Sequence, residues 1–434
     1  MRLQVLSEQQ VEDIHSTSVR ILCEVGVCFG SRKALDILGS AGGRVDVDQK
    51  RVRIPEGLVE RALQTTSGHF RLWDRGRNEF IDLQDGQIRG HNVGGCVRIF
   101  DAARDLLREA TQDDLEQLAE LMDGLENIHV CRPVVYPAEC PSSVRDIYTT
   151  AIMLQHTGKP YGVTSYSLKN LAYILDLLNV IAGGLAELQA KPFVWGSVCP
   201  DSPLFYTENT ADILIEYAEL GIPVAIAPCP ICGGTGPVTL AGSLAQLNAE
   251  FLAGLVLVQV VRPGIDVKYT ARPMPMDMRT GTATFGAIET GLMSAAIVQL
   301  AKRYRVCSDV YGLGTRSKAL DEQTAYEKAL NGLLVGLAGA DLIAAAGLLE
   351  DALTSSAEQL VIDNEILGMI FRAVQGITIT ADTLAFEIIS AIGPGGSFLT
   401  EPHTLAYMRK EYFQPRLVRS GLVAQLPGDQ TLLA

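Results

Sequence analysis

Aromatic residues recur where apolar segments of the sequence end. Aromatic residues make up only 6% of the chain, yet several of its 13 tyrosines stand at such ends, namely Tyr136, Tyr166, Tyr206, Tyr269 and Tyr311. Aromatic faces with carboxylates nearby attract cationic ammonium groups. Tyrosine also ends strands for packing reasons alone, because its ring packs while its hydroxyl stays in water. The pattern predicts a site for a cationic ligand if these segment ends meet.

Other polar residues stand at or near the same ends. Arg272 follows Tyr269 by three positions, and Glu350 follows an apolar run that ends at Ala346. His91 and Asn92 come just before the first such run. The set also includes Glu139, Ser165, Asp201, Phe205, Cys229 and Cys232. From it we take the five tyrosines, Arg272, Glu350 and His91 as candidate substrate-binding residues.

The segment Cys229-Pro-Ile-Cys232 could bind a metal or act in redox chemistry. A zinc site needs about four ligands, and no second pair of cysteines at this spacing accompanies the first. Four residues lie between His91 and Cys96, which is a poor match to usual ligand spacings. We therefore expect no bound metal, and a zinc-assisted enzyme that uses Cys229 and Cys232 is the alternative.

The glycine-rich segment ICGGTGP, residues 231–237, resembles a phosphate-binding loop. It lacks the Lys-Ser/Thr of a P-loop and the spacing of a dinucleotide-binding motif. Its glycines would instead let the backbone approach a bulky ligand or partner closely. The six histidines form no triad with serine or cysteine.

Eight strand-like segments alternate with eight helical segments after residue 85. Some strand segments, such as PVAIAP and LIAAA, are apolar throughout, which is typical of parallel strands covered on both faces. The alternation predicts an α/β fold of the TIM (β/α)8 barrel type, with its site at the carboxyl ends of the strands. An open doubly wound sheet is the competing fold. The predicted strands are 94–100, 129–136, 160–165, 192–198, 222–228, 265–271, 306–311 and 341–346, and the helices are 111–124, 142–157, 167–182, 207–220, 237–262, 285–303, 321–338 and 355–375.

The regions on either side of this alternation have different patterns. Residues 1–85 mix short helical and strand-like segments and predict a small N-terminal α+β cap, which begins with a capping box at Ser7 and Gln10. Residues 86–375 carry the barrel pattern, and residues 376–434 form a C-terminal extension.

Composition limits the class of partner. The chain has 434 residues, a net charge of −14 and a pI near 5.0, which argues against nucleic acid and anionic membranes. The most apolar stretch, residues 251–258, is too short to span a membrane, and the first ten residues lack the apolar core of a signal peptide. Nine cysteines without regular spacing are typical of reduced thiols. We therefore expect a cytoplasmic enzyme.

Long segments of the chain, in order and over nearly its whole length, carry a family resemblance. They include LSEQQVEDIHSTSVRILCEVGV, VRIPEGLVERAL, GGTGPVTLAGSLAQLNAEFLAGLVLVQVVRPG, DMRTGTATFGAIET, GLGTRSKALDEQTAYEKAL and GPGGSFLTEPHTLAYMRKEYFQPRL. The chain resembles the trimethylamine methyltransferase family, including its non-pyrrolysine branch, typified by glycine betaine:corrinoid methyltransferase.

This resemblance implies a TIM barrel that transfers a methyl group from a small methylated amine to the corrinoid (cobalamin) of a cognate partner protein. Archaeal members carry pyrrolysine at a barrel strand end, in or next to residues 311–316, where this chain has only standard amino acids. A quaternary ammonium departs as a neutral amine when Co(I) attacks its methyl carbon, whereas a tertiary amine must first be activated. We therefore expect a quaternary, glycine betaine-like amine, bound mainly by positioning and desolvation.

The resemblance also suggests where the corrinoid approaches. Gly312 and Gly314 form an elbow after a predicted strand, and we expect this elbow to give the corrinoid room at the barrel mouth. Gly233 and Gly234 are expected to do the same on another loop.

Candidate catalytic residues follow from helix geometry near that elbow. Gln323 and Glu327 are four residues apart and share a helix face, and Glu289 stands near another helix start. Acids in a first helical turn are also favoured by the helix dipole alone. Arg272 is the candidate for a betaine carboxylate, because its planar fork matches that group.

Two other functions stay open, namely a zinc-assisted methyltransferase or lyase and a non-catalytic betaine-binding protein without a corrinoid partner. We expect a homo-oligomer. Family members usually continue further past the PRL segment than this chain, which ends in VAQLPGDQTLLA, so docking of a partner or second subunit by that tail is in doubt.

Overall fold

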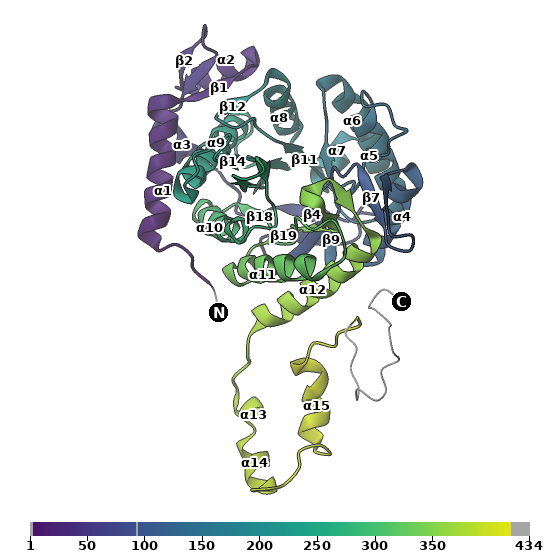
Figure 1. Ribbon diagram of the computed structural model, residues 1–434. Coiled ribbons are helices and arrows are strands. Elements are labelled where there is room, and N and C mark those ends of the chain that lie inside the picture. The colour runs from purple at the N-terminus through teal and green to yellow at the C-terminus, as the bar shows by residue number, and fades with distance from the viewer. Residues whose placement is uncertain (1–2, 93, 418–434) are drawn as a thin grey trace.

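A ring of eight parallel strands forms the centre of the protein in the computed structural model, which describes residues 3–92 and 94–417 (Figure 1). The strands pair in the order β10-β11-β13-β15-β18-β19-β6-β9, and backbone hydrogen bonds between Cys131 and residues 160–162 close the ring. The TIM barrel is confirmed, and the open sheet was the wrong alternative. The strands are β6 (Arg89–Asn92), β9 (Ile128–Val130), β10 (Tyr161–Thr164), β11 (Val194–Val198), β13 (Val224–Ile226), β15 (Val267–Tyr269), β18 (Cys307–Tyr311) and β19 (Leu342–Ala346).

Helices surround the ring, and each predicted helical segment overlaps one of them. They are α4 (Gln112–Gly124), α5 (Arg145–His156), α6 (Leu168–Ala182) followed by α7 (Leu185–Ala190), α8 (Glu208–Leu220), α9 (Leu240–Val261), α10 (Ile288–Tyr304), α11 (Glu322–Ala338) and α12 (Ala357–Gln375). The periodicity of the apolar residues in these helices sets their bounds. The carboxyl ends of the strands form one open end of the barrel, called here the mouth.

The first barrel strand lies earlier than predicted. Residues 94–100 were expected to form it, but β6 ends at Asn92, and β7 (Arg98–Asp101) belongs to a separate sheet with β8 (Leu106–Glu109), β21 (Thr354–Ser355) and β20 (Leu348–Leu349). Two glycines divide these segments: Gly95 has a φ of +116°, and a Cβ on Gly94 would lie 2.1 Å from the Pro133 oxygen. His91 and Asn92 therefore lie within a barrel strand.

The N-terminal segment covers one side and the base of the barrel. Helices α1 (Glu8–Arg20) and α3 (Glu56–Gln64) pack on α9, and the Ser7–Gln10 capping box is present. Its other elements are η1 (Ile21–Val25), β1 (Val27–Phe29), α2 (Arg32–Ser40), β2 (Arg44–Asp46), β3 (Arg51–Arg53), β4 (Arg71–Trp73) and β5 (Phe80–Asp82). Phe70, Leu72 and Leu83, around the β4–β5 hairpin, pack with Trp195 and Leu342 inside the ring. This apolar cluster fills the lumen opposite the mouth.

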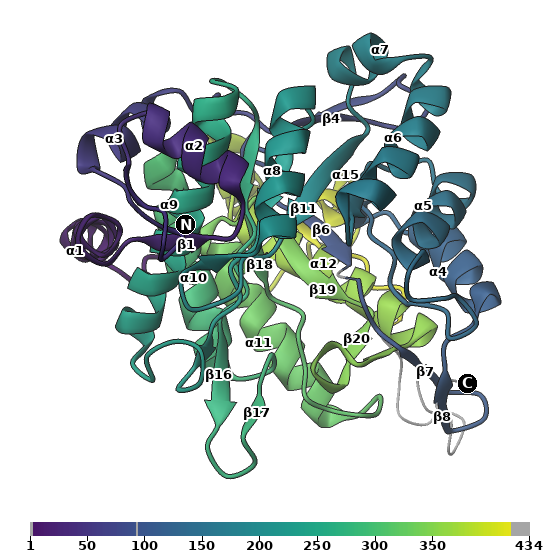
Figure 2. The same ribbon diagram turned by 90° about the horizontal axis from the view of Figure 1, so that it is seen from above.

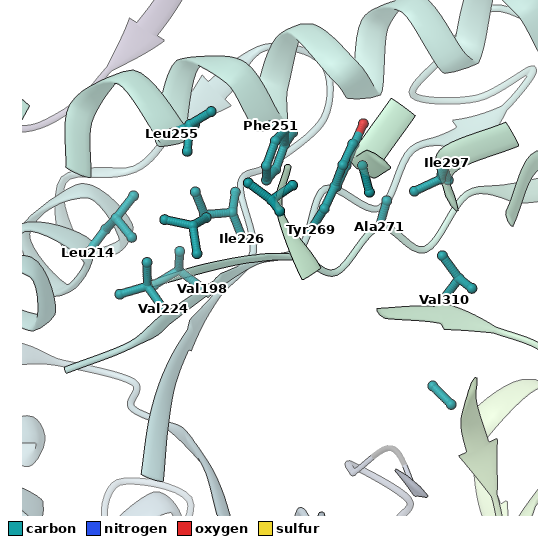
Figure 3. Packing of buried hydrophobic residues seen from close by; sticks show 14 of the residues in the cluster. Val198, Leu214, Val224, Ile226, Phe251, Leu255, Tyr269, Ala271, Ile297 and Val310 are labelled. Atoms are coloured by element: carbon teal, nitrogen blue, oxygen red, sulfur yellow. The ribbon is translucent and has the colours of Figure 1, made fainter. Parts of the chain in front are cut away.

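Helix α9 has the length and apolar composition of a membrane span, but 89% of its most apolar stretch is buried. Figure 3 shows Phe251 and Leu255 of α9 facing Ile226 and Tyr269 on the outer side of the strands. The helix is apolar on all sides because the barrel lies on one side of it and the N-terminal helices lie on the other. It is therefore a core helix.

The chain leaves the barrel after α12 as an arm, residues 376–412, that projects away from the ring (Figure 1). The arm contains α13 (Ala381–Leu384), α14 (Phe386–Ile392) and α15 (Pro402–Glu411), none of which has a buried residue. It returns where Arg372 donates to the Glu411 carbonyl oxygen at 2.9 Å. The VAQLPGDQTLLA segment lies outside the described residues.

Candidate active site in the barrel lumen

A cluster of charged residues lies in the middle of the lumen, around Asp309 of β18. The Asp309 carboxylate contacts Lys268 Nζ at 2.8 Å, Arg272 Nη2 at 2.6 Å and His91 Nε2 at 2.9 Å. All four side chains are buried. They meet because alternate residues of barrel strands face inward, so Lys268, Thr270 and Arg272 share one face of the β15 segment.

Burial and charge set the protonation of this cluster. Burial lowers the pKa of His91, so its imidazole is neutral at pH 7. Burial opposes ionisation of Asp309, but Arg272 and Lys268 outweigh it and hold the pKa of Asp309 well below its usual range. The cluster therefore contains two cations and one carboxylate.

A third cation, Arg132, lies beside this cluster, just after β9. Its Nη1 donates to Ser197 Oγ at 3.3 Å, and its Nη2 donates to Thr164 Oγ1. These two hydroxyls are partners in the register of β10 and β11. Arg132 and burial both lower the pKa of Lys268, burial more strongly, which places the two cations within electrostatic reach of one another.

Two cysteine thiols lie beyond the carboxyl ends of β11 and β13, on the side of the mouth. Cys199, after β11, is exposed to solvent, and Cys229, after β13, is half-buried. A hydrogen bond with Cys229 and the guanidinium groups of Arg132 and Arg272 lower the pKa of Cys199 to about 7, although burial opposes this. The Cys199 side chain is therefore accessible to solvent, although protein atoms surround it closely enough to oppose its ionisation.

Of the five predicted tyrosines, Tyr311 contacts the cluster, and Tyr136 and Tyr166 lie beside each other after β9 and β10. The rings of Tyr136 and Tyr166 meet edge to face, with centroids 6.4 Å apart. Arg145 lies over the Tyr136 ring at 5.6 Å. Tyr311 is buried, with the guanidinium of Arg272 4.5 Å from its ring centre.

The other two tyrosines point away from the lumen, which corrects their assignment to the mouth. Tyr206 belongs to β12 (Phe205–Tyr206), which pairs with β1 of the N-terminal sheet, and its ring stacks on Phe29 at 5.0 Å. Tyr269 stacks on Phe251 of α9 at 3.7 Å, and its hydroxyl donates to Asn248. Both are fully buried packing residues.

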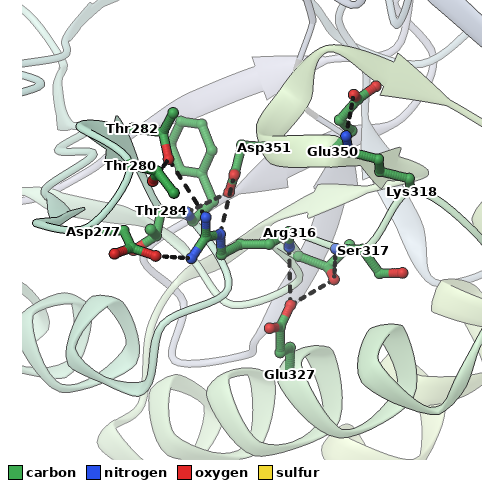
Figure 4. Close-up of polar contacts among 12 residues, drawn as sticks. Asp277, Thr280, Thr282, Thr284, Arg316, Ser317, Lys318, Glu327, Glu350 and Asp351 are labelled. Atoms are coloured by element: carbon green, nitrogen blue, oxygen red, sulfur yellow. Dashed lines mark hydrogen bonds and ion pairs between the residues drawn. The ribbon is translucent and has the colours of Figure 1, made fainter.

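The loop after β18 is held at the rim by Glu327 (Figure 4). Glu327 Oε2 accepts from Thr315 Oγ1 at 2.6 Å and from the Arg316 amide at 2.9 Å, while Gln323 donates to Oε1 at 2.9 Å. Gln323 and Glu327 thus share a helix face, as predicted, but their described contacts are with this loop and with each other. Glu289 is exposed at the start of α10.

Two hairpins extend beyond the barrel on the mouth side, β7–β8 and the pair β16 (Met274–Asp277) and β17 (Thr282–Ala283) (Figure 2). Arg316 joins the second of these to the loop after β18 through an ion pair with Asp277 at 3.0 Å. Glu350, in the turn η2 (Glu350–Ala352), pairs with Arg98 of β7 at 3.0 Å. Glu350 therefore ties rim segments together.

The turn η2 holds three consecutive residues at positive φ, namely Glu350, Asp351 and Ala352. This backbone costs about 1–3 kcal/mol per residue. Amide hydrogen bonds from Glu350 to the Ser317 oxygen at 2.7 Å and from Asp351 to the Thr315 oxygen at 2.9 Å hold it in place. Burial raises the pKa of Asp351 to about 6.

The glycines of the predicted corrinoid approach differ in their surroundings. A Cβ on Gly312 would lie 2.7 Å from Ile343 Cγ2, and one on Gly314 would lie 2.9 Å from Phe285 Cβ. These two glycines allow close packing inside the protein, which corrects the expectation that they open the mouth. Gly233, in the turn after β14 (Ile231–Cys232), has a φ of +93°, and a Cβ on Gly233 or Gly234 would meet nothing closer than 3.4 Å.

Cys229 and Cys232 do not share one environment. Cys229 Sγ lies 3.1 Å from the Ala227 oxygen, whereas Cys232 Sγ contacts Met293 Sδ at 3.9 Å. Within residues 3–92 and 94–417, no three side chains of His, Cys, Asp or Glu converge as metal ligands. The described residues therefore bring no set of zinc ligands together around Cys229 and Cys232.

Comparison with known proteins shows the family. The family model described as trimethylamine methyltransferase (MTTB) matches residues 1–423. The chain belongs to the trimethylamine methyltransferase family. It is 34% identical to the trimethylamine methyltransferase MttB of Desulfitobacterium hafniense, over 93% of this chain and 82% of that one. It is also 31% identical to a glycine betaine methyltransferase of Desulfitobacterium hafniense, over 95% of this chain and 86% of that one.

Solved structures agree with the barrel fold. The monomethylamine methyltransferase MtmB of Methanosarcina barkeri has a TM-score of 0.55 at 12% identity, over 90% of this chain and 81% of that one. A hydroxylamine complex of MtmB has a TM-score of 0.56, over 91% and 82%. At this identity the likeness shows the fold.

In this member of the trimethylamine methyltransferase family, the sequence reasoning missed Asp309, Lys268, Arg132 and Cys199. The available signal was a charge inside an apolar strand segment, as in VKYTAR for Lys268 and CSDVY for Asp309. A buried charge needs a partner, so two such charges on separate barrel strands predict each other. Arg132 and Cys199 carried no comparable signal, because they lie just beyond their strands.

Proposed function

We propose that the protein transfers a methyl group from a quaternary amine, of the glycine betaine kind, to the Co(I) corrinoid of a partner protein. Membership of the trimethylamine methyltransferase family over residues 1–423 carries this proposal. The glycine betaine methyltransferase among the relatives supports the class of amine.

The leaving group explains the preference for a quaternary amine. Co(I) supplies the electron pair that forms the new bond to the methyl carbon, and the C–N electron pair stays on nitrogen. A quaternary ammonium thereby leaves as a neutral tertiary amine and needs no proton. The residues of this chain then have only to orient the substrate and exclude water.

The lumen has features suited to that task. Tyr136 and Tyr166 present aromatic edges and faces near the mouth, where an N-methyl group would meet the acceptor. Nearby positive charge also favours the reaction, because the substrate nitrogen loses its charge in the transition state. Gly233 and Gly234 leave the backbone of one mouth loop open to a large planar acceptor.

The acidic composition and the burial of α9 favour a cytoplasmic location for this reaction. The partner is a corrinoid protein, and nucleic acid and membranes play no part in the proposal. A non-catalytic betaine-binding protein is the second candidate, because the same lumen would hold the ligand without an acceptor.

The experiment mixes the protein with reduced cobalamin and one amine at a time, and follows the absorbance of the Co(I) form. Quaternary amines should consume Co(I), and trimethylamine should not. Transfer from trimethylamine alone would contradict the leaving-group argument. Binding of betaines without any transfer would favour the non-catalytic candidate.

A further inference from the structure

The barrel lumen carries more positive than negative charge. Asp309 is the one carboxylate that the described residues place in contact with Lys268 and Arg272, and it forms ion pairs with both. His91 adds no charge, because burial lowers its pKa. Arg132 then brings a further cation to the same space. A bare organic cation would meet net repulsion here, whereas a ligand with an anionic end would meet attraction.

Arg132 forms no ion pair with a carboxylate among the described residues, although it lies close enough to Cys199 to lower the pKa of that thiol. Within the described part of the chain, its side chain donates hydrogen bonds to the neutral hydroxyls of Ser197 and Thr164. Its Nε atom is buried and has no hydrogen-bond partner within the described part of the chain. A buried donor without a partner destabilises the unliganded protein, and a bound acceptor would offset this cost.

The protein holds Arg132 in place from its backbone. Asn92, which is fully buried on β6, accepts from the Arg132 amide at 2.9 Å and donates to its carbonyl oxygen at 2.7 Å. Gly162 supplies the room for the side chain, since a Cβ there would lie 3.0 Å from Arg132 Cγ and 2.5 Å from Trp195 Cζ2. The guanidinium is therefore preorganised before any ligand binds.

Arg272, predicted to bind a betaine carboxylate, is already occupied. Its Nη2 contacts Asp309 Oδ1 at 2.6 Å, it donates to the Asp309 carbonyl oxygen, and its face covers the Tyr311 ring. The side chain is also 6% exposed. Arg132, by contrast, still has a donor to give.

We propose that Arg132 binds the carboxylate of the substrate, so that the N-methyl end of the molecule faces the mouth near Tyr136 and Tyr166. This inference rests on the proposed function and narrows its substrates to zwitterions that carry both a quaternary nitrogen and a carboxylate. Quaternary amines without an anionic group, such as choline, are then poor ligands.

The first test uses the unaltered protein and needs no corrinoid. Isothermal titration compares glycine betaine with choline and with the methyl ester of glycine betaine, which keep the N-methyl groups but lack the carboxylate. Glycine betaine should bind about 10-fold or more tightly than either cation. Equal affinity for the three ligands would overturn the inference.

The second test compares Arg132→Gln and Arg132→Lys with Arg104→Gln, a control at a side chain that is 72% exposed on the β7–β8 turn. Arg132→Gln should lower the affinity for glycine betaine by about 10-fold or more, because the group that binds the carboxylate is lost. The same variant should bind choline as tightly as the unaltered protein or more tightly, because a charge that repels the cation is removed. Arg132→Lys should keep part of the preference, and the control should bind like the unaltered protein. Unchanged betaine binding by Arg132→Gln would overturn the inference.

Different results would contradict the proposed function and the carboxylate site at Arg132. Arg132-dependent binding without methyl transfer would contradict the proposed function and leave the carboxylate site standing. Methyl transfer from glycine betaine that is unaffected by Arg132→Gln would contradict the carboxylate site and leave the proposed function standing.

Discussion

Asp309 is the residue on which the charge balance of the lumen depends. Its carboxylate lies within 2.9 Å of Lys268 Nζ, Arg272 Nη2 and His91 Nε2, and burial deprives each group of water. Removing one partner of a buried ion pair leaves an uncompensated charge, which costs more than the pair itself contributes.

We therefore expect Asp309→Asn to lower the free energy of unfolding by about 3–5 kcal/mol, measured by chemical denaturation. The control is Asp36→Asn, which removes an exposed ion pair with Arg32 on α2 and should cost about 0.5 kcal/mol or less. Similar costs for the two variants would show that the cluster is not the charge-paired unit described above.

The pKa of Cys199 depends on its neighbours near the mouth. A hydrogen bond with Cys229 is the strongest influence on its pKa, which is about 7, and Arg132 and Arg272 add to it. Only the thiolate is alkylated readily, so reactivity should rise as the pH increases through 7.

We expect alkylation of Cys199 by iodoacetamide, followed by mass spectrometry, to have its midpoint near pH 7. Cys229→Ala should move the midpoint to higher pH, because it removes the hydrogen bond that stabilises the Cys199 thiolate most strongly. Cys28, a half-buried thiol of the N-terminal sheet, is the internal control. A Cys199 midpoint equal to the usual value of 9.0 would contradict the described contacts with Cys229 and the two arginines.

At the scale of elements, the elbow after β18 is a packing device. A Cβ on Gly312 would lie 2.7 Å from Ile343 Cγ2 and 2.8 Å from Val335 Cγ2, so the strand can pass β19 and α11 only with glycine there. Added methyl groups in a filled core displace their neighbours and destabilise the fold.

Gly312→Ala should therefore lower the melting temperature, at a cost of about 1–3 kcal/mol in the free energy of unfolding. Gly124→Ala, at the end of α4, is the matched control, since nothing lies within 4 Å of a Cβ there. That control should be neutral or slightly stabilising. A neutral Gly312→Ala would mean that the elbow has room, as the sequence-based hypothesis assumed.

Elements were predicted better than the directions of their side chains. The helices followed from apolar periodicity, and seven of the barrel strands followed from apolar runs. Strand β6 was missed because its sequence, Arg-Gly-His-Asn, is short and polar. Tyr269 was misassigned because alternation shows that it and Lys268 face opposite ways, but not which way is inward. That choice depends on closure of the ring, which joins residues far apart in sequence.

At the scale of the molecule, the arm beyond α12 carries large exposed apolar side chains. Phe386 is 69% exposed and Leu405 is 66% exposed, and short helices of this kind are not stable alone. Exposed apolar patches of this sort mark contact surfaces. The expected homo-oligomer stays a prediction, and the arm is where we expect the contact.

Light scattering should give a mass that is a multiple of 46.8 kDa. Phe386→Glu with Leu405→Glu should reduce it, because charges oppose burial of the arm, whereas Glu387→Gln, on the same helix as Phe386, should leave it unchanged. An unaltered protein with the mass of one chain would contradict this prediction.

The proposed function requires the methyl group of a betaine to reach the corrinoid. The most direct measurement supplies the protein with glycine betaine that carries deuterium on its N-methyl groups, together with the corrinoid protein in its Co(I) form. Both products are then analysed by mass spectrometry. We predict one labelled methyl group on the corrinoid for each dimethylglycine formed. Turnover of betaine without label on the corrinoid, or label from trimethylamine but none from betaine, would contradict it.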